Sequence, residues 1–304
     1  MWELDGRDWP NREASRFVAA AGLRWHVQIL GQGPVALLLH GTGAATHSWR
    51  GLAPALARHF TVVAPDLPGH GFTEAPPPRG FTLPGMAAAV AALLHTVGLR
   101  PSLAIGHSAG AAILARMCLD GAIAPKLLVS LNGALLPLTG VPGRIFSPMA
   151  RLLAATPLVP RVFAWRAADG GAVARLVAGT GSRLDREGIE LYGRLIRRPG
   201  HVAGALAMMA NWDLRPLVHD LPRLTVPLAL IVAENDRTVP PAESRRVQRL
   251  VPAARLESLH GLGHLAHEER PEEVAALIVR LARGAGALRQ RHAPGPPAAG
   301  TALL

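Results

Sequence analysis

The sequence feature that most constrains the fold is a Gly-X-Ser-X-Gly pentapeptide, Gly106-His107-Ser108-Ala109-Gly110, between an apolar run and a stretch of small residues. Glycines on both sides of a serine permit a sharp turn from a strand into a helix, which holds the hydroxyl clear of a sheet. The pattern predicts such a turn here, with Ser108 as a candidate nucleophile. An ordinary Gly/Ser loop is the alternative.

Short aliphatic runs alternate with Ala- and Leu-rich stretches along most of the chain, which is typical of a mostly parallel sheet covered by helices. The sequence therefore predicts an α/β fold. We expect strands at residues 23–29, 35–39, 61–64, 102–105, 127–131, 228–232 and 255–259, and helices at 49–58, 83–97, 108–119, 242–250 and 271–283.

This alternation breaks between residues 136 and 221, where every predicted element is a helix. A helical insertion of this length in an α/β chain is most simply a lid over the carboxyl ends of the strands. We therefore expect a core of residues 1–135 and 222–284, a lid of residues 136–221, and a disordered tail of residues 285–304 rich in Gly, Ala and Pro. The lid helices are predicted at residues 145–155, 160–168, 171–177, 186–197 and 201–212.

A serine nucleophile requires a base, and the base requires an acid that orients it. His264 is the candidate base because it lies in a glycine-rich loop just after the last predicted strand. His260 and His267 are weaker alternatives. Asp236 follows the preceding strand and is the candidate acid, with Glu234 as the weaker alternative.

The reaction would also need two N–H donors for a developing oxyanion. The loop after the strand at 35–39 can present the amide of Thr42, and Ala109 directly follows the candidate nucleophile. His107 is expected to point back into the structure. Asn132, at the end of the strand at 127–131, cannot serve as the acid.

The chain order Ser108, Asp236, His264 resembles the α/β-hydrolase superfamily, as does the loop Asp66-Leu67-Pro68-Gly69-His70-Gly71 after the third predicted strand. The resemblance covers residues 22–283. It implies an α/β-hydrolase fold and hydrolysis of an ester-like bond by a catalytic triad. It does not specify the substrate.

Four segments look more specifically like the magnesium-chelatase accessory proteins of bacteriochlorophyll biosynthesis, a family with the same fold. This resemblance implies a cytoplasmic protein of a photosynthetic bacterium that acts at or near magnesium insertion into protoporphyrin. Its expected partners are a small-molecule substrate, such as a porphyrin or chlorophyll intermediate, and magnesium-chelatase subunits. A non-catalytic accessory protein that binds either partner is the alternative. The segments are residues 8–12, 41–50, 109–116 and 263–269.

The predicted lid combines many arginines with large apolar side chains. A macrocycle with two carboxylates would need an apolar slot and guanidinium groups. We therefore expect substrate contacts from Trp49, before the lid, and from Phe146, Trp165, Met208 and Trp212 within it. The alternative is that the lid helices are simply amphipathic and their arginines face water.

Composition excludes several other classes of protein. The formal net charge is +11, but the arginines are dispersed and no RNA-binding motif occurs, so we expect no nucleic-acid partner. Cys118 is the only cysteine, which excludes an intrachain disulfide and a cysteine-based zinc site. No cluster of ligands with metal spacing stands out, and we expect neither a metal nor a cofactor.

A secretory signal begins with basic residues followed by an apolar run, whereas residues 1–10 contain the acidic Glu3, Asp5 and Asp8. We therefore expect no secretory signal here. Long uncharged stretches, such as residues 127–143, are interrupted by Asn132, Pro137 and Pro142, so no transmembrane helix is expected.

Overall fold

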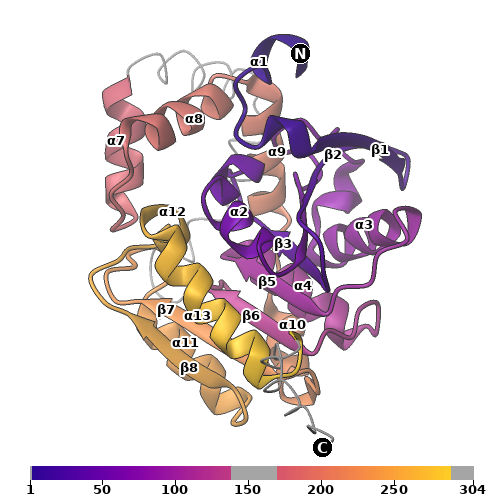
Figure 1. The fold of residues 1–304 in the computed structure, drawn as a ribbon, viewed down its shortest axis with the longest axis vertical. Helices are drawn as coiled ribbons and strands as arrows, with labels where there is room; N and C mark the ends of the chain where they lie inside the picture. Colours follow the sequence, from indigo (N-terminus) through magenta and orange to yellow (C-terminus); the bar gives the residue numbers. More distant parts are fainter. Residues whose placement is uncertain (1, 138–169, 289–304) are drawn as a thin grey trace, which may run out of the picture.

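An eight-stranded sheet runs through the computed structural model, which describes residues 2–137 and 170–288 (Figure 1). The strand order is β1-β2-β4-β3-β5-β6-β7-β8. Strand β2 pairs antiparallel with β1 and β4, and all other pairs are parallel. The strands are β1 (Ser15–Ala20), β2 (Leu23–Leu30), β3 (Val35–Leu39), β4 (Thr61–Pro65), β5 (Leu103–His107), β6 (Leu127–Leu131), β7 (Leu228–Ala233) and β8 (Arg255–Leu259).

All seven predicted strands are present, and β1 is an additional one. Its side chains alternate poorly between buried and exposed because it lies at the edge of the sheet. A two-residue turn joins it to β2, with Ala21 and Gly22 both at positive φ (51° and 73°). Such a turn matches the twist of a hairpin, and Ala-Gly is a weaker hairpin signal than Asn-Gly.

Helices cover both faces of the sheet, as the sequence predicts. Along β3, Leu37 and Leu39 join the core on one face, while Ala36 and Leu38 join the core on the other. The first core includes α3 (Leu83–Thr96) and α4 (Ala109–Leu119), with contributions from α10 (Arg215–Asp220) and α11 (Pro241–Leu250). The second includes α2 (Leu52–Ala57) and α13 (Pro271–Gly284), which pack against each other (Figure 1).

Three helices that match predicted ones lie in the described part of the predicted lid. They are α7 (Gly170–Gly179), α8 (Arg186–Ile196) and α9 (Pro199–Ala210), close to the predicted bounds. Figure 1 shows α7 and α8 together at one end of the molecule. The helices predicted at 145–155 and 160–168 lie outside the described residues. Helix α10, within the predicted lid, instead packs on α4, with Leu217 fully buried in the core.

Six short elements complete the described chain. Of these, α12 directly follows the loop that carries His264. They are α1 (Trp2–Asp5), η1 (Arg12–Ala14), η2 (Thr46–Trp49), η3 (Pro78–Phe81), η4 (Leu221–Arg223) and α12 (Ala266–Glu269).

Residues 285–288, predicted as the start of a disordered tail, pack against the core. Ala287 is buried, and its carbonyl accepts a hydrogen bond from the Ser102 hydroxyl at 3.1 Å. The rest of the predicted tail lies outside the described residues. In the described parts of the chain, no helix is long and apolar enough to cross a membrane.

Candidate active site

Ser108 occupies the predicted sharp turn between β5 and α4, with φ 51° and ψ −118°. Residues other than glycine rarely adopt this backbone conformation, and backbone strain of this kind is concentrated at functional sites. The flanking glycines are required sterically. A Cβ at Gly106 would lie 2.4 Å from the backbone of Ala111, and one at Gly110 would lie 2.1 Å from the Leu39 carbonyl oxygen.

Asp236 and His264 form a direct pair at the ends of β7 and β8. His264 Nδ1 lies 2.7 Å from Asp236 Oδ2, and both residues are buried. The other oxygen, Oδ1, accepts hydrogen bonds from the backbone N–H groups of Thr238 (2.7 Å) and Val239 (2.8 Å). The carboxylate is therefore fixed with Oδ2 toward the imidazole, which favours the tautomer with the proton on Nδ1 and a lone pair on Nε2.

The backbone of His264 is held by two side chains that the sequence pattern does not assign to the site. Asn132 Nδ2 donates to the His264 carbonyl at 2.9 Å and to the Gly263 carbonyl at 3.2 Å, while its Oδ1 accepts the Ala233 N–H at 2.8 Å. His107 Nε2 also bonds the His264 carbonyl, at 2.9 Å. Asn132, rejected as the acid, thus links β6 and β7 to the loop of the candidate base.

The segment after helix α7 also contacts the loops that carry Asp236 and His264. The Thr180 carbonyl, after α7, accepts the N–H of Arg237 at 3.1 Å and of His264 at 3.4 Å. Gly181 and Gly263 are in such close contact that a Cβ on Gly263 would lie 2.3 Å from the Gly181 carbonyl carbon. The lid therefore contacts the backbone on both sides of the Asp236–His264 pair.

His107 connects Ser108 to His264, because it precedes the serine in the chain and its ring contacts the His264 ring. The ring centroids of His107 and His264 are 4.6 Å apart, and His107 directly precedes the serine. Within residues 2–137 and 170–288, the structure contains no hydrogen bond between the Ser108 hydroxyl and the His264 ring. Such catalytic hydrogen bonds are often long before substrate binds and tighten in the complex.

The loop after β3 lies against the serine. A Cβ on Gly41 would be 2.9 Å from Cβ of Ser108. The Ala44 N–H donates to the Gly41 carbonyl at 3.2 Å, and Gly43 has φ 79°, which fits a type II turn. We call residues 41–44 the oxyanion turn. Thr42 lies inside this turn, and Ala109 is the first residue of α4, where backbone N–H groups lack partners within the helix.

The weaker alternatives to the acid and base have other partners than the pair. Glu234 and His260 bond each other at 2.8 Å, with their side chains 49% and 82% exposed. His267 is fully buried, and its Nε2 lies 2.9 Å from the Ser48 hydroxyl. Burial raises the pKa of the Cys118 thiol to about 12, so Cys118 remains a protonated thiol at neutral pH.

The expected substrate contacts have different surroundings. Trp49 is 0% exposed and packs against His267, so it offers no surface to a ligand in this structure. Met208 is also fully buried, and its sulfur accepts the Thr42 hydroxyl at 3.5 Å. Trp212 is partly buried beside the core. Phe146 and Trp165 lie outside the described residues.

Several lid arginines pair with acidic residues of this chain. Arg194 lies 2.8 Å from Asp8, and Arg198 lies 3.9 Å from Asp5, so these two side chains connect the lid to the N-terminal segment. Four further lid arginines lie outside the described residues: Arg144, Arg151, Arg161 and Arg166.

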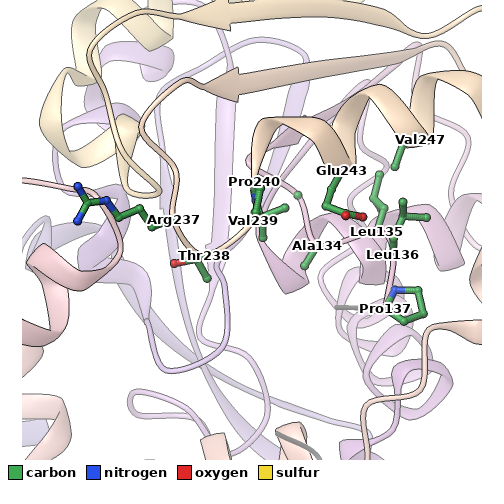
Figure 2. A pocket seen from close by; sticks show the side chains of 11 residues that line it. Ala134, Leu135, Leu136, Pro137, Arg237, Thr238, Val239, Pro240, Glu243 and Val247 are labelled. Carbon is green, nitrogen blue, oxygen red and sulfur yellow. The ribbon is translucent and has the colours of Figure 1, made fainter. Parts of the chain in front are cut away.

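A cavity of about 180 Å³ lies near the turn that carries Ser108. Figure 2 shows Leu135 and Val247 on its wall, with the carboxylate of Glu243 between the loop after β6 and helix α11. The cavity adjoins both parts of the site, because the Ala134 N–H bonds the Ser108 carbonyl at 3.0 Å and Arg237 follows Asp236. Its lining residues are Gly133, Ala134, Leu135, Leu136, Pro137, Arg237, Thr238, Val239, Pro240, Glu243 and Val247.

Among the residues that the structure describes, no group of three or more His, Cys, Asp or Glu side chains is placed to hold a metal ion.

Comparisons with known proteins agree with this architecture. The model of the Alpha/beta hydrolase family matches residues 36–277. A solved structure of an alpha/beta hydrolase fold protein from Burkholderia ambifaria superposes with a TM-score of 0.73 at 23% identity, covering 88% of this chain and 97% of that one. The predicted fold class is therefore confirmed.

Two curated proteins are similar along most of their length. The magnesium-chelatase 30 kDa subunit of Rhodobacter capsulatus is 38% identical over 279 residues, which cover 91% of this chain and 97% of that protein. Pyrrolizixenacetamide deacetylase of Xenorhabdus hominickii is 28% identical over 264 residues, which cover 82% and 90%. The first similarity confirms the predicted resemblance to a magnesium-chelatase protein.

Proposed function

Because this chain belongs to the α/β hydrolase family, we propose that it is a serine hydrolase that cleaves an ester-like bond. Ser108 is the proposed nucleophile, His264 the base and Asp236 the orienting acid. The observation that carries the proposal is the Asp236–His264 pair beside a serine whose backbone is held at φ 51°.

In the proposed reaction, the Ser108 hydroxyl attacks the carbonyl carbon while His264 Nε2 takes its proton. The imidazolium returns that proton to the leaving alcohol, which leaves an acyl group on the serine. A water molecule, activated by the same nitrogen, then releases the acid and restores the hydroxyl. Asp236 stabilises the imidazolium through Nδ1 and is not itself protonated.

The negative charge that develops on the carbonyl oxygen needs donors already in place. We propose the N–H groups of Thr42, in the oxyanion turn, and of Ala109, the first residue of α4. In support, the Thr42 N–H has no acceptor in residues 2–137 and 170–288. The N–H of Ala109 lies at the positive end of the α4 dipole, which favours an anion.

We further propose that the hydrolase acts at or near magnesium insertion in bacteriochlorophyll biosynthesis, in the cytoplasm, on a porphyrin or chlorophyll intermediate. The similarity to the magnesium-chelatase 30 kDa subunit supports this role. The deacetylase among the relatives supports acyl transfer chemistry on this fold.

A fluorophosphonate probe tests the chemistry directly, since it modifies serines activated in this way. We expect covalent labelling of the parent protein at Ser108 and none in Ser108→Ala. Ser102→Ala is the matched control, because its hydroxyl bonds the Ala287 carbonyl at the opposite end of β5. A folded parent that labels no more than Ser108→Ala would refute the hydrolase proposal.

The second candidate function is a non-catalytic accessory that binds a porphyrin or a chelatase subunit. The specific observation that favours it is the 38% identity to a named chelatase subunit. Fluorescence titration with protoporphyrin and with magnesium protoporphyrin tests porphyrin binding, and co-purification tests the subunits. The absence of saturable binding to all of these would exclude this candidate.

Complementation separates the two functions. In a strain that lacks the protein, the accessory function predicts that Ser108→Ala restores accumulation of magnesium porphyrins to the parent level. The hydrolase function predicts that it does not.

A further inference from the structure

We propose that His201, on lid helix α9, is a positioning residue that holds the oxyanion turn in its working shape. This inference rests on the proposed function of the Ser108 site. It goes beyond that function by making a lid helix responsible for where the Thr42 N–H points.

His201 bridges two loops that are remote from it in sequence. Its Nε2 lies 3.1 Å from the Gly43 carbonyl oxygen, within the oxyanion turn, and its Nδ1 accepts the Gly71 N–H at 3.1 Å. Only the neutral imidazole with the proton on Nε2 satisfies both contacts. Burial lowers the pKa of His201 to about 4, which keeps the ring neutral near pH 7.

Gly71 is itself rigidly placed. It has φ 51°, and a Cβ there would lie 2.1 Å from Oδ2 of Asp66. Asp66 is fully buried and also accepts the backbone N–H of Thr46, at 2.7 Å. Gly71 is thus held by its packing against buried Asp66. Because His201 bonds both Gly71 and Gly43, it ties the Gly43 carbonyl to this fixed loop.

The same face of α9 makes two more contacts at helical spacing. Three residues on, Gly204 packs so closely on Gly69 that a Cβ would lie 2.0 Å from the Gly69 carbonyl oxygen. Four residues further, Met208 accepts the Thr42 hydroxyl at 3.5 Å. Helix α9 therefore docks through contacts about two turns apart, and His201 and Met208, near its two ends, both hold the oxyanion turn.

Three contacts hold the oxyanion turn around Thr42. The Gly41 carbonyl bonds His40 Nδ1 at 2.8 Å, the Thr42 hydroxyl bonds Met208, and the Gly43 carbonyl bonds His201. The Gly41 carbonyl shares a planar peptide unit with the Thr42 N–H, so the contact on that carbonyl restricts the direction of the N–H. The contacts on the Thr42 side chain and on the Gly43 carbonyl hold the rest of the turn. A displacement of α9 would release two of the three contacts.

Replacement of His201 tests the proposal. His201→Phe keeps an aromatic ring and removes both hydrogen bonds, whereas His201→Gln offers a donor and an acceptor. With p-nitrophenyl acetate as the probe, we expect kcat to fall about 10- to 100-fold in His201→Phe with little change in KM, since an oxyanion contact forms in the transition state. We expect His201→Gln to recover a large part of that loss.

His219→Phe is the matched control, since His219 lies on α10 with its side chain 85% exposed. Hydrogen exchange of a peptide that covers residues 40–46 supplies a readout that does not depend on activity. We expect exchange there to quicken in His201→Phe and not in His219→Phe. If His201→Phe does not fold, Met208→Leu, which removes the acceptor for Thr42, is expected to quicken the same exchange.

The outcomes distinguish the two proposals. A parent protein whose Ser108 does not react with the fluorophosphonate refutes the hydrolase function, and the exchange measurement then still decides whether α9 holds the turn. An active parent with unchanged kcat and unchanged exchange in His201→Phe overturns the positioning role. Equal loss in His201→Phe and His201→Gln, without faster exchange at residues 40–46, overturns it as well.

Discussion

Nδ1 of His264 lies 2.7 Å from Oδ2 of Asp236, and the second oxygen of this carboxylate is held by two backbone N–H groups. The carboxylate therefore cannot rotate to present Oδ1 to the ring without losing both bonds. This geometry suits the role proposed for Asp236, which is to keep the imidazole in a single tautomer and orientation.

We expect Asp236→Asn to lower kcat for p-nitrophenyl acetate by about 10³- to 10⁴-fold, because the amide favours the wrong tautomer of His264. Thermal unfolding followed by circular dichroism checks that the variant is folded. Glu234→Gln is the matched control, since it alters a carboxylate two residues away that pairs with exposed His260. Equal losses in the two variants would contradict the assignment of Asp236.

Asn132 supplies a second prediction about the position of the base. Its φ of 46° is acceptable to glycine, so Asn132→Gly removes the side-chain hydrogen bonds without backbone strain. Because the carbonyls of Gly263 and His264 then lose a buried donor, we expect about a 10-fold or greater fall in kcat and a loss of about 1–3 kcal/mol in the free energy of unfolding.

Asn11→Gly is the control for this variant, because Asn11 also has positive φ (54°) and makes only a long side-chain contact of 3.5 Å. Steady-state kinetics and urea denaturation of both variants check the prediction. If Asn132→Gly retains parental kcat, Asn132 does not position the base.

The sequence was sufficient for features whose signal is local or ordered along the chain. The Gly106-to-Gly110 pentapeptide specifies its own strand, turn and helix through sterics, since a Cβ at either flanking glycine would collide with backbone atoms. The pairing of Asp236 with His264 followed from chain order, because adjacent parallel strands bring their carboxyl ends to one edge.

Contacts between distant residues could not be predicted in this way. Asn132 and His264 are 132 positions apart, and His201 and Gly43 are 158 apart, so no periodic pattern links them. Residue type was also a poor guide to direction. Trp49 suits either a pocket or a core, and only the packing of η2 against His267 places it fully inside.

The buried carboxylate of Asp66 supplies a stability prediction. It accepts hydrogen bonds from Thr46 and Phe72 and pairs with His26 at 2.8 Å, with both side chains fully buried. Removing one partner leaves the others unsatisfied, so we expect Asp66→Ala to lower the free energy of unfolding by about 3–5 kcal/mol. Urea denaturation measures it.

Asp213→Ala is the comparison for Asp66→Ala, because Asp213 makes a surface pair with Arg215. Exposed pairs of this kind contribute less than about 1 kcal/mol. Similar losses in the two variants would show that the Asp66 network does not stabilise the core.

The buried histidines predict a stability that declines as the pH falls. Burial lowers the pKa of His201 to about 4 and of His267 to about 3, and it holds the pKa values of His47, His70 and His107 well below the usual 6.5. Between pH 6.5 and about 4, these histidines are therefore protonated in the unfolded chain but stay neutral in the folded chain. Stability is complete above pH 6.5 and is lost as the pH falls below it.

Each such histidine contributes at most about 1.4 kcal/mol per pH unit within that window, and about 1 kcal/mol between pH 6.5 and 5.5. Urea denaturation at pH 7.5, 6.5 and 5.5 should show a smaller loss over the first step than over the second. His201→Gln should make the second step shallower by about 1 kcal/mol, since glutamine does not titrate. Buried Asp66 cannot produce this loss. Its pKa is lowered in the folded chain, so its protonation would reduce stability only at pH values below the ordinary aspartate pKa near 3.8. A free energy of unfolding that stays level from pH 6.5 to 5.5 would show that these rings can accept protons without unfolding the chain.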